Sequence, residues 1–222
     1  MKIIIPAKTS SIRVKNKNFR EFYQRESLVD ILVNKLLKVV GPNDIYLSTD
    51  SEEIKTYCEN KGINYTHRSP KFCDNDTPIS DVVKEIVKSI PGEDDIAWCC
   101  VTDPLFDEFE NVFERWRINK QQYDSLAVIY EEPSYVLSNN FEFLNFGIGK
   151  SHVSTQKIKP FYFLHNTIFI SKRKEINKNS YYFGENNYWY ISNEFSIDID
   201  TEAQFRAAQL IYEDNEKERI IN

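Results

Sequence analysis

Glycine is scarce in this sequence, with only six among its 222 residues. None of the six belongs to a Walker A loop or a G-x-G-x-x-G loop, the glycine-rich turns that bring backbone amides close to phosphates. The H-E-x-x-H motif of zinc proteases, the G-x-S-x-G motif of serine hydrolases and zinc-ligand spacings are also missing. These absences disfavour the common hydrolases and dehydrogenases.

Long apolar runs and paired cysteines are missing too. No run approaches the roughly 18 to 20 apolar residues of a membrane span, and Met1 leads into Lys2 and an isoleucine strand rather than into a signal peptide. The four cysteines show no C-x-x-C spacing and include an adjacent pair, Cys99 and Cys100, in an apolar run. We therefore expect a cytoplasmic protein with reduced thiols and no membrane partner.

Charge is unevenly distributed along the chain. The formal net charge is -6, yet residues 1–25 contain seven lysines and arginines against one acid, which leaves the remainder at -12. A basic end of this kind is typical of a disordered nucleic-acid-binding arm or of a local site for a small polyanion. Because this segment begins with an apolar strand and contains no low-complexity run, we favour the small polyanion and expect no nucleic-acid partner.

Apolar periodicity predicts strands that alternate with helices. Strands are expected at 2–7, 45–48, 63–66, 96–101 and 125–130, and helices at 28–39, 79–90, 109–116 and after residue 200. Asp50 with Glu53, and Thr201 with Gln204, are candidates for helix-capping boxes. The pattern predicts an α/β fold, a three-layer Rossmann-like mixed sheet in which the loops after the strands converge on a ligand.

The alternation stops after Tyr130. Residues 131–160 have no long helical pattern and contain Gly147 and Gly149. We expect residues 1–222 to form a single domain with a small protruding dimerisation arm at about 131–160. An apolar arm needs a partner surface, so we expect a homodimer.

The loop from Pro6 to Asn18 is the first candidate site. Four cations and several small polar residues follow the first strand there. Lys8, Arg13 and Lys17 are suited to neutralising a triphosphate, with neutral hydroxyl and amide donors beside them. The alternative is a solvated basic loop without a ligand.

Two carboxylates form the second candidate site. Asp198 and Asp200 lie two residues apart in a strand-like stretch, so their side chains should face the same way. Paired carboxylates suit Mg²⁺ bound together with substrate phosphates. Helix capping is an alternative for Asp200, but it does not explain Asp198.

A third candidate lies in residues 155–170, a stretch that begins polar and ends as an apolar strand. His165 and Asn166 interrupt the apolar residues and could grip a hydroxylated substrate. A buried, hydrogen-bonded histidine is the alternative, and we expect His67 and His152 to be surface residues.

Together these segments resemble the acylneuraminate cytidylyltransferase family, which comprises the CMP-sialic acid synthetases and their relatives that act on 3-deoxy-octulosonate. The resemblance covers nearly the whole chain and rests on segments in the family's order, at residues 4–18, 47–54, 68–83, 102–105, 155–170 and 198–201. The last of these, Asp198-Ile-Asp-Thr201, matches the family's D-I-D-T.

The resemblance implies a nucleotide-diphospho-sugar transferase type of fold and a nucleotidyltransferase that joins CTP to an acidic sugar and releases pyrophosphate. It implies that Lys8 and Lys17 hold phosphates and act in catalysis with Asp198 and Asp200, which carry Mg²⁺. The nucleotide-binding residues would be Ala7, Lys8, Arg13, Lys17, Asn18 and Arg68. The acceptor-binding residues would be Gln156, Tyr162, His165 and Asn166.

The sequence also departs from the family pattern. Residues 8–13 contain no glycine and have Ile12 at a usual lysine position, and Cys100 replaces a glutamine. In the third segment Thr155 replaces an arginine, and His165 with Asn166 replaces Asn-Gly. These changes leave open an acceptor other than a sialic acid and a nucleotide- or glycan-binding protein that has lost turnover. A glycosyltransferase that consumes a nucleotide sugar is a further alternative, since its fold would also be a nucleotide-binding α/β sheet with paired aspartates.

Overall fold

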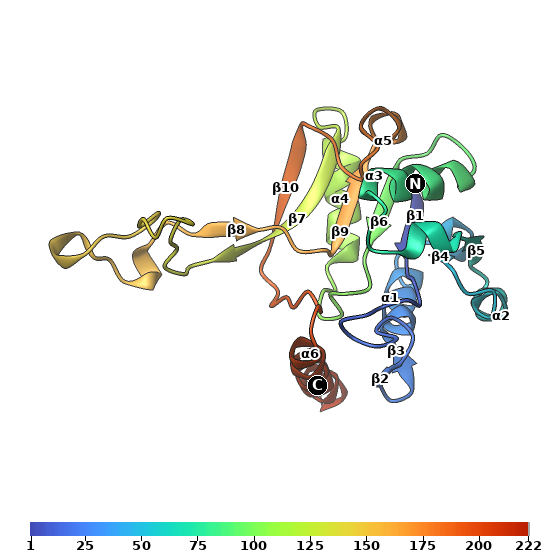
Figure 1. Cartoon of the computed structure of the whole chain (residues 1–222), viewed down its shortest axis with the longest axis horizontal. Helices are drawn as coiled ribbons and strands as arrows, with labels where there is room; N and C mark the ends of the chain where they lie inside the picture. Colours follow the sequence, from blue (N-terminus) through green and yellow to red (C-terminus); the bar gives the residue numbers. More distant parts are fainter. Residues whose placement is uncertain (222) are drawn as a thin grey trace.

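The computed structural model describes residues 1–221, with side chains up to Arg219, and is built around a mixed sheet of eight strands (Figure 1). The order is β10-β7-β9-β6-β1-β4-β5, and β8 pairs with β7 outside this path. The strands are β1 (Lys2–Pro6), β4 (Ile45–Thr49), β5 (Asn64–His67), β6 (Ile96–Cys99), β7 (Ser125–Glu132), β8 (Phe161–Phe163), β9 (Ile168–Ser171) and β10 (Asn187–Ser192). β8 and β9 run antiparallel to their neighbours, and the other pairs are parallel.

Helices cover both faces of this sheet. One hydrophobic core lies under α1 (Leu28–Leu37), α2 (Ile54–Lys61), α4 (Phe109–Asn119) and α6 (Glu202–Ile221). A second lies under α3 (Ile79–Ser89) and α5 (Arg173–Asn179). Strand β1 divides between them, since Ile3 and Ile5 belong to the first core and Ile4 to the second. The predicted three-layer α/β fold is confirmed.

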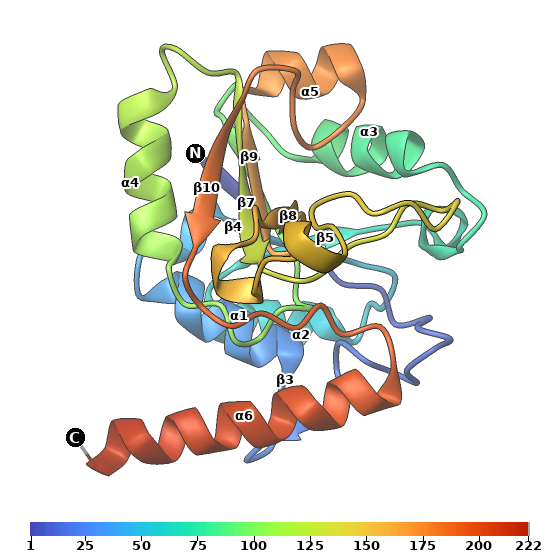
Figure 2. The same cartoon turned by 90° about the vertical axis from the view of Figure 1, so that its left-hand side faces the viewer.

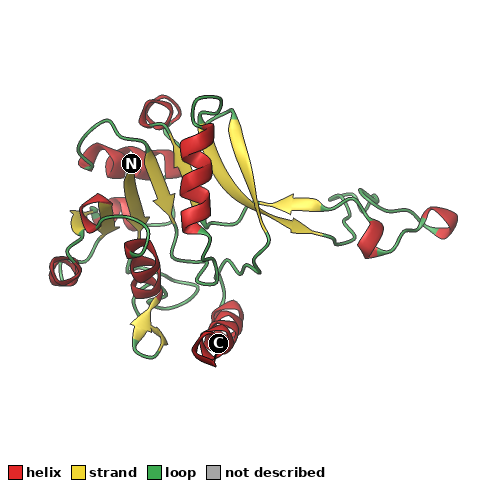
Figure 3. Cartoon of the chain, turned by 180° about the vertical axis from the view of Figure 1, so that it is seen from behind, coloured by secondary structure: helices red, strands yellow, loops and turns green. Residues whose placement is uncertain are grey.

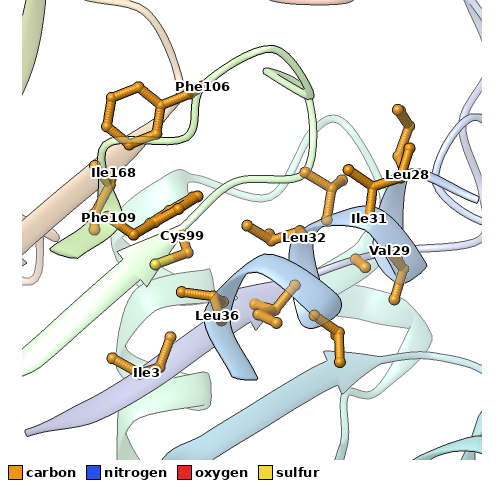
Figure 4. Packing of buried hydrophobic residues seen from close by; sticks show 14 of the residues in the cluster. Ile3, Leu28, Val29, Ile31, Leu32, Leu36, Cys99, Phe106, Phe109 and Ile168 are labelled. Carbon is orange, nitrogen blue, oxygen red and sulfur yellow. The ribbon is translucent and has the colours of Figure 1, made fainter. Parts of the chain in front are cut away.

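Helix α1 shows how the first core is built. Ser27 caps its N-terminus in a capping box with Asp30, the third helical residue. Leu32 and Leu36 belong to the same buried cluster as Ile3 of β1, and Figure 4 shows Leu36 beside Ile3. Full burial of a leucine side chain contributes about 2 kcal/mol, so this periodic face fixes the helix on the sheet.

Helix α6 lies at the edge of the molecule, beside a two-stranded hairpin of β2 (Glu21–Tyr23) and β3 (Glu26–Ser27) (Figure 2). Phe205 of the helix meets Phe22 of the hairpin edge-to-face, with ring centroids 5.2 Å apart. The predicted cap is present, because the backbone N–H of Gln204 donates to Thr201 Oγ1 at 3.2 Å. Phe205, Ala208 and Tyr212 place this helix on the first core. Among the described residues no helix is long and apolar enough to span a membrane.

The prediction that Asp50 caps a helix is wrong. Helix α2 begins at Ile54, after a Glu53 that makes no capping bond. The Asp50 carboxylate instead accepts hydrogen bonds from Thr9 N at 2.8 Å and Thr9 Oγ1 at 2.7 Å. Desolvation opposes its ionisation, but the bonds from Thr9, the backbone amide of Asp50 and the charge of Arg68 together lower the pKa of Asp50.

The segment between β7 and β8 protrudes from the sheet as an arm (Figures 1 and 3). Its regular structure is limited to two short 3-10 turns, Gly149–Ser151 and Thr155–Lys157, and a bridge between Leu137 and Phe143. Phe141 is 82% exposed and Ile148 is 72% exposed. The predicted protrusion is therefore present, and its role in dimerisation stays a prediction.

Candidate functional site

A cavity of about 460 Å³ opens at the carboxyl end of β1. It is lined by Pro6, Lys8, Ser11, Ile12, Arg13, Val14, Lys17, Asn18, Arg68, Asn75, Ile79, Val82, Trp98, Cys100, Val101, Thr102, Asn166, Tyr182, Asp198 and Asp200. Segments far apart in the sequence meet there, as expected for the carboxyl edge of a parallel sheet.

The basic loop after β1 is held in shape without glycine. Val14 is buried in the core, and Asn18 Nδ2 donates to the Lys8 carbonyl at 2.8 Å across the loop. The left-handed backbone conformation occurs at Asn16, with φ of 51°, and asparagine tolerates this conformation better than most residues. Asn18 Oδ1 is buried and has no partner among the described residues. It is an acceptor available to a donor on a ligand.

Two lysines of the loop point into the cavity wall. Lys8 Nζ donates to the Cys73 carbonyl at 2.9 Å and to Asn75 Oδ1 at 2.7 Å. Lys17 Nζ donates to the Ile199 carbonyl and lies 3.7 Å from Asp200 Oδ1. Burial lowers the pKa of both lysines, and the Asp200 carboxylate partly opposes this for Lys17. A polyanion that entered the cavity would strengthen the charged form of each.

Arg68 adds a third, more deeply buried cation. Only 4% of the residue is exposed, and its Nε has no partner among the described residues. Its backbone amide donates to the Thr49 carbonyl at 2.8 Å, which fixes it at the end of β5. A buried guanidinium nitrogen without an acceptor is costly, so the arrangement suits a ligand that supplies one.

The two predicted carboxylates face the same cavity. Asp198 Oδ2 accepts from Asn166 Nδ2 at 2.8 Å, and Asp200 Oδ1 accepts from Arg13 Nη2 at 2.7 Å. Between them Ile199 is fully buried, and its amide donates to the Thr102 carbonyl at 2.9 Å. The stretch forms no strand, contrary to expectation, yet the half-buried Asp198 and Asp200 on either side of the buried Ile199 face the same cavity, as predicted.

This pair fits a magnesium ion shared with a ligand. The described residues contain no group of three or more histidine, cysteine or acidic side chains that could hold a metal. Two carboxylates on one cavity wall would therefore supply part of the coordination shell, and phosphate oxygens and water the rest. The ion pair with Arg13 would have to open first.

An aromatic wall of the cavity was not predicted from the sequence. Trp98 of β6 stacks on Tyr182, with ring centroids 5.5 Å apart, and Ile79 and Val82 of α3 lie on the same lining. Tyr182 follows a short helix whose pattern is too brief to detect. Cys100 also lines the cavity, and burial raises its pKa to about 12, so it is a neutral thiol.

Of the residues predicted for the site, eight line this cavity: Lys8, Arg13, Lys17, Asn18, Arg68, Asn166, Asp198 and Asp200. The others lie elsewhere. Ala7 is buried in the core, Gln156 lies in a 3-10 turn of the arm, and Tyr162 lies in β8. His165 is half-buried, with Nδ1 2.7 Å from Ser196 Oγ. The binding roles proposed for these four stay predictions.

The cytidylyltransferase family model matches residues 2–219, nearly the whole chain. The chain belongs to the cytidylyltransferase family. Among curated members it is 23% identical over 210 residues to an N-acylneuraminate cytidylyltransferase of Streptococcus agalactiae, covering 91% of this chain and 51% of that protein. It is 24% identical over 217 residues to a pseudaminic acid cytidylyltransferase and UDP-2,4-diacetamido-2,4,6-trideoxy-beta-L-altropyranose hydrolase of Helicobacter pylori, covering 91% and 40%. The chain thus spans about half the length of the curated relatives it matches, or less.

Solved structures of cytidylyltransferases share this fold. A CMP:2-keto-3-deoxy-manno-octonic acid synthetase complexed with CTP superposes with a TM-score of 0.67 at 12% identity, over 96% of this chain and 98% of that one. A 4-diphosphocytidyl-2C-methyl-D-erythritol synthase from Anaerococcus prevotii gives 0.62 at 11% identity, over 96% and 95%. The expected nucleotidyltransferase type of fold is confirmed.

Proposed function

We propose that this cytidylyltransferase-family chain transfers CMP from CTP to an acidic sugar and releases pyrophosphate, with Mg²⁺ as cofactor. The observation that carries the proposal is one cavity in which four cations, Lys8, Arg13, Lys17 and Arg68, lie with two carboxylates. Membership of the family and its acid-sugar cytidylyltransferases support the choice of nucleotide and of acceptor class.

The chain's own residues would act mainly by position and charge. Lys8 and Arg13 would hold the outer phosphates, and Lys17, beside Asp200, would lie near the α-phosphate. Asp198 and Asp200 would hold the magnesium, which neutralises charge that develops on the phosphate oxygens. The acceptor hydroxyl attacks the α-phosphorus as the bond to pyrophosphate breaks, and the fixed cations stabilise that charge.

The test is pyrophosphate release from each nucleoside triphosphate with Mg²⁺, measured against a panel of sialic, octulosonic and legionaminic-type acids. We expect pyrophosphate release with CTP and with none of the other nucleoside triphosphates, together with a product that has the mass of a CMP conjugate. If CTP binds but no acceptor in the panel gives pyrophosphate release, a nucleotide-binding protein without turnover is favoured. The altered loop and Cys100 also suit that alternative. Turnover of a nucleotide sugar without pyrophosphate release would favour a glycosyltransferase.

We also propose that the arm mediates a homodimer. Several apolar side chains of the arm are exposed to water, and Phe141 is the most exposed of them. Exposed apolar groups of this kind often mark a surface that contacts another protein. Light scattering coupled to size exclusion should give a dimer for the wild type and a monomer for Phe141→Asp. Leu210→Asp, at an exposed leucine of α6, is the matched control and should stay dimeric. A monomeric wild type would contradict the proposal.

A further inference from the structure

A buried carboxylate lies close to the cavity and belongs to none of the predicted sites. Asp103 is 5% exposed, and its Oδ2 accepts three hydroxyl bonds, from Tyr130 at 2.8 Å, Thr167 at 2.7 Å and Ser196 at 2.8 Å. Its Oδ1 is buried and has no partner among the described residues. Each of the three hydroxyls donates its proton to the same carboxylate oxygen, so the donor and the acceptor of every hydrogen bond in the cluster are fixed.

The chain of hydrogen bonds extends from Asp103 through Ser196 to His165. His165 Nδ1 lies 2.7 Å from Ser196 Oγ, and the imidazole packs on the Tyr130 ring with centroids 4.8 Å apart. Ser196 has one hydroxyl proton, and it donates that proton to the Asp103 carboxylate. Its oxygen must therefore accept from Nδ1–H of His165. A neutral His165 then carries its free lone pair on Nε2, which has no partner among the described residues.

This histidine lies at the carboxylate end of the cavity. The next residue, Asn166, lines the cavity and donates to Asp198 Oδ2 at 2.8 Å. Ser196, on the other side, precedes Asp198 by two residues. His165 itself is half-buried and does not line the cavity, so an acceptor would have to lie beside Asp198 to reach both the ring and a nucleotide in the cavity.

We propose that His165 Nε2 accepts the proton of the attacking acceptor hydroxyl, and that Asp103, acting through Ser196, is a positioning residue that sets the His165 tautomer. The inference rests on the proposed function. In the step, the hydroxyl oxygen forms a bond to the α-phosphorus while its proton passes to Nε2. The bond between the α-phosphorus and pyrophosphate breaks, and pyrophosphate leaves with the electron pair.

The charges around the ring suit this role. Asp103 lies one hydroxyl away from His165, and Asp198 accepts a hydrogen bond from the adjacent Asn166. Burial raises the pKa of Asp103, and the hydrogen bonds from Thr167, Ser196 and Tyr130 oppose that rise. Burial raises the pKa of Tyr130, so the phenol packed on the ring stays neutral and remains a donor. A proton gained by the ring would therefore lie one hydroxyl away from the Asp103 carboxyl group.

The first experiment measures turnover. His165→Gln should lower kcat about 100-fold or more, the usual contribution of a general base, and should leave CTP affinity unchanged because His165 does not line the cavity. The fall of kcat/KM on the acid side, where the ring is protonated, should disappear. His67→Gln, at an exposed histidine of β5, is the matched control and should behave as wild type. Asp103→Asn should lower kcat with little change in KM and shift the acid-side fall to lower pH.

The second experiment reads the tautomer without any substrate. The chain has three histidines, so long-range ¹H–¹⁵N correlation spectra can assign the His165 ring by its loss in His165→Gln. The wild type should show a proton on Nδ1, and Asp103→Asn or Ser196→Ala should lose this preference. A merely structural role for Asp103 would not change the tautomer in Asp103→Asn.

The outcomes separate the two proposals. If the wild type releases no pyrophosphate in the assay, the proposed function and the proton-transfer role of His165 are both overturned. Turnover by the wild type with an unchanged kcat and acid-side fall in His165→Gln overturns only the role of His165. A proton on Nε2 of the neutral wild-type ring overturns both the positioning role of Asp103 and the base role of His165, because Nε2 then has no free lone pair.

Discussion

The ion pair between Arg13 and Asp200 occupies an oxygen that the proposed magnesium needs. Arg13 Nη2 lies 2.7 Å from Asp200 Oδ1, and the two side chains are 71% and 41% exposed. In the nucleotide complex we expect Arg13 to move to a phosphate and release Asp200. Replacement of Arg13 by glutamine should therefore have opposite effects on binding of the metal and of the nucleotide.

The exposure of the pair sets the size of the metal effect. A solvent-exposed ion pair contributes at most about 1 kcal/mol, which corresponds to a factor of about five in a binding constant. Mn²⁺, as a probe for magnesium, should therefore bind Arg13→Gln up to about fivefold more tightly when no nucleotide is present. Loss of a charge-assisted bond to phosphate costs about 1.5 to 3 kcal/mol, so CTP should bind about tenfold to 150-fold more weakly.

Electron paramagnetic resonance of free Mn²⁺ and calorimetric titration of CTP measure the two affinities. Lys15→Gln is the matched control, since it removes one positive charge from an exposed position in the same loop that does not line the cavity. Its Mn²⁺ and CTP affinities should change little. The reasoning is refuted if Arg13→Gln binds Mn²⁺ no more tightly than wild type, or if both variants behave alike.

Three further outcomes are expected. Asp200→Asn should reduce metal-dependent pyrophosphate release at least 100-fold while the melting temperature changes little, because the carboxylate is partly exposed and acts on charge rather than on packing. Asp50→Asn should lower the free energy of unfolding by about 1 kcal/mol at pH 7, since it weakens the bonds from Thr9; because the folded pKa of Asp50 is lowered, the difference should shrink as pH falls through the acid range, which urea titrations at several pH values can follow. Phe106→Ala, at a fully buried ring, should cost about 3 to 5 kcal/mol in the same titrations, whereas Leu210→Ala, at an exposed leucine of α6, should cost less than about 0.5 kcal/mol.

The sequence predicted most of the fold because its signals are local. The run Ile3 to Ile5 and the apolar face of residues 79–90 each specify an element by their own periodicity. The elements that escaped prediction are short or depend on distant contacts. Helix α5 has seven residues, and the β2–β3 hairpin is held by Phe205 of α6, far along the chain.

The residues of the candidate site likewise fall into those with a local sequence signal and those that only the fold brings together. Lys17 and Asp198 were predictable because a cation-rich loop and a paired-carboxylate motif are visible in the sequence. Asp103 was not, since its importance comes from hydroxyls on three other segments that only the fold brings together. The error over Asp50 has the same origin: its sequence neighbour Glu53 suggested a local cap, and the contact that forms is with Thr9 of another loop.

The most direct test of the cavity's role is a crystal structure of the protein soaked with CTP and Mg²⁺. The account predicts a triphosphate between Lys8, Arg13 and Lys17, with a metal ion on Asp198 and Asp200 and with Arg13 withdrawn from Asp200. CTP bound outside this cavity, or a metal-bound triphosphate that leaves both carboxylates uncoordinated, would contradict it.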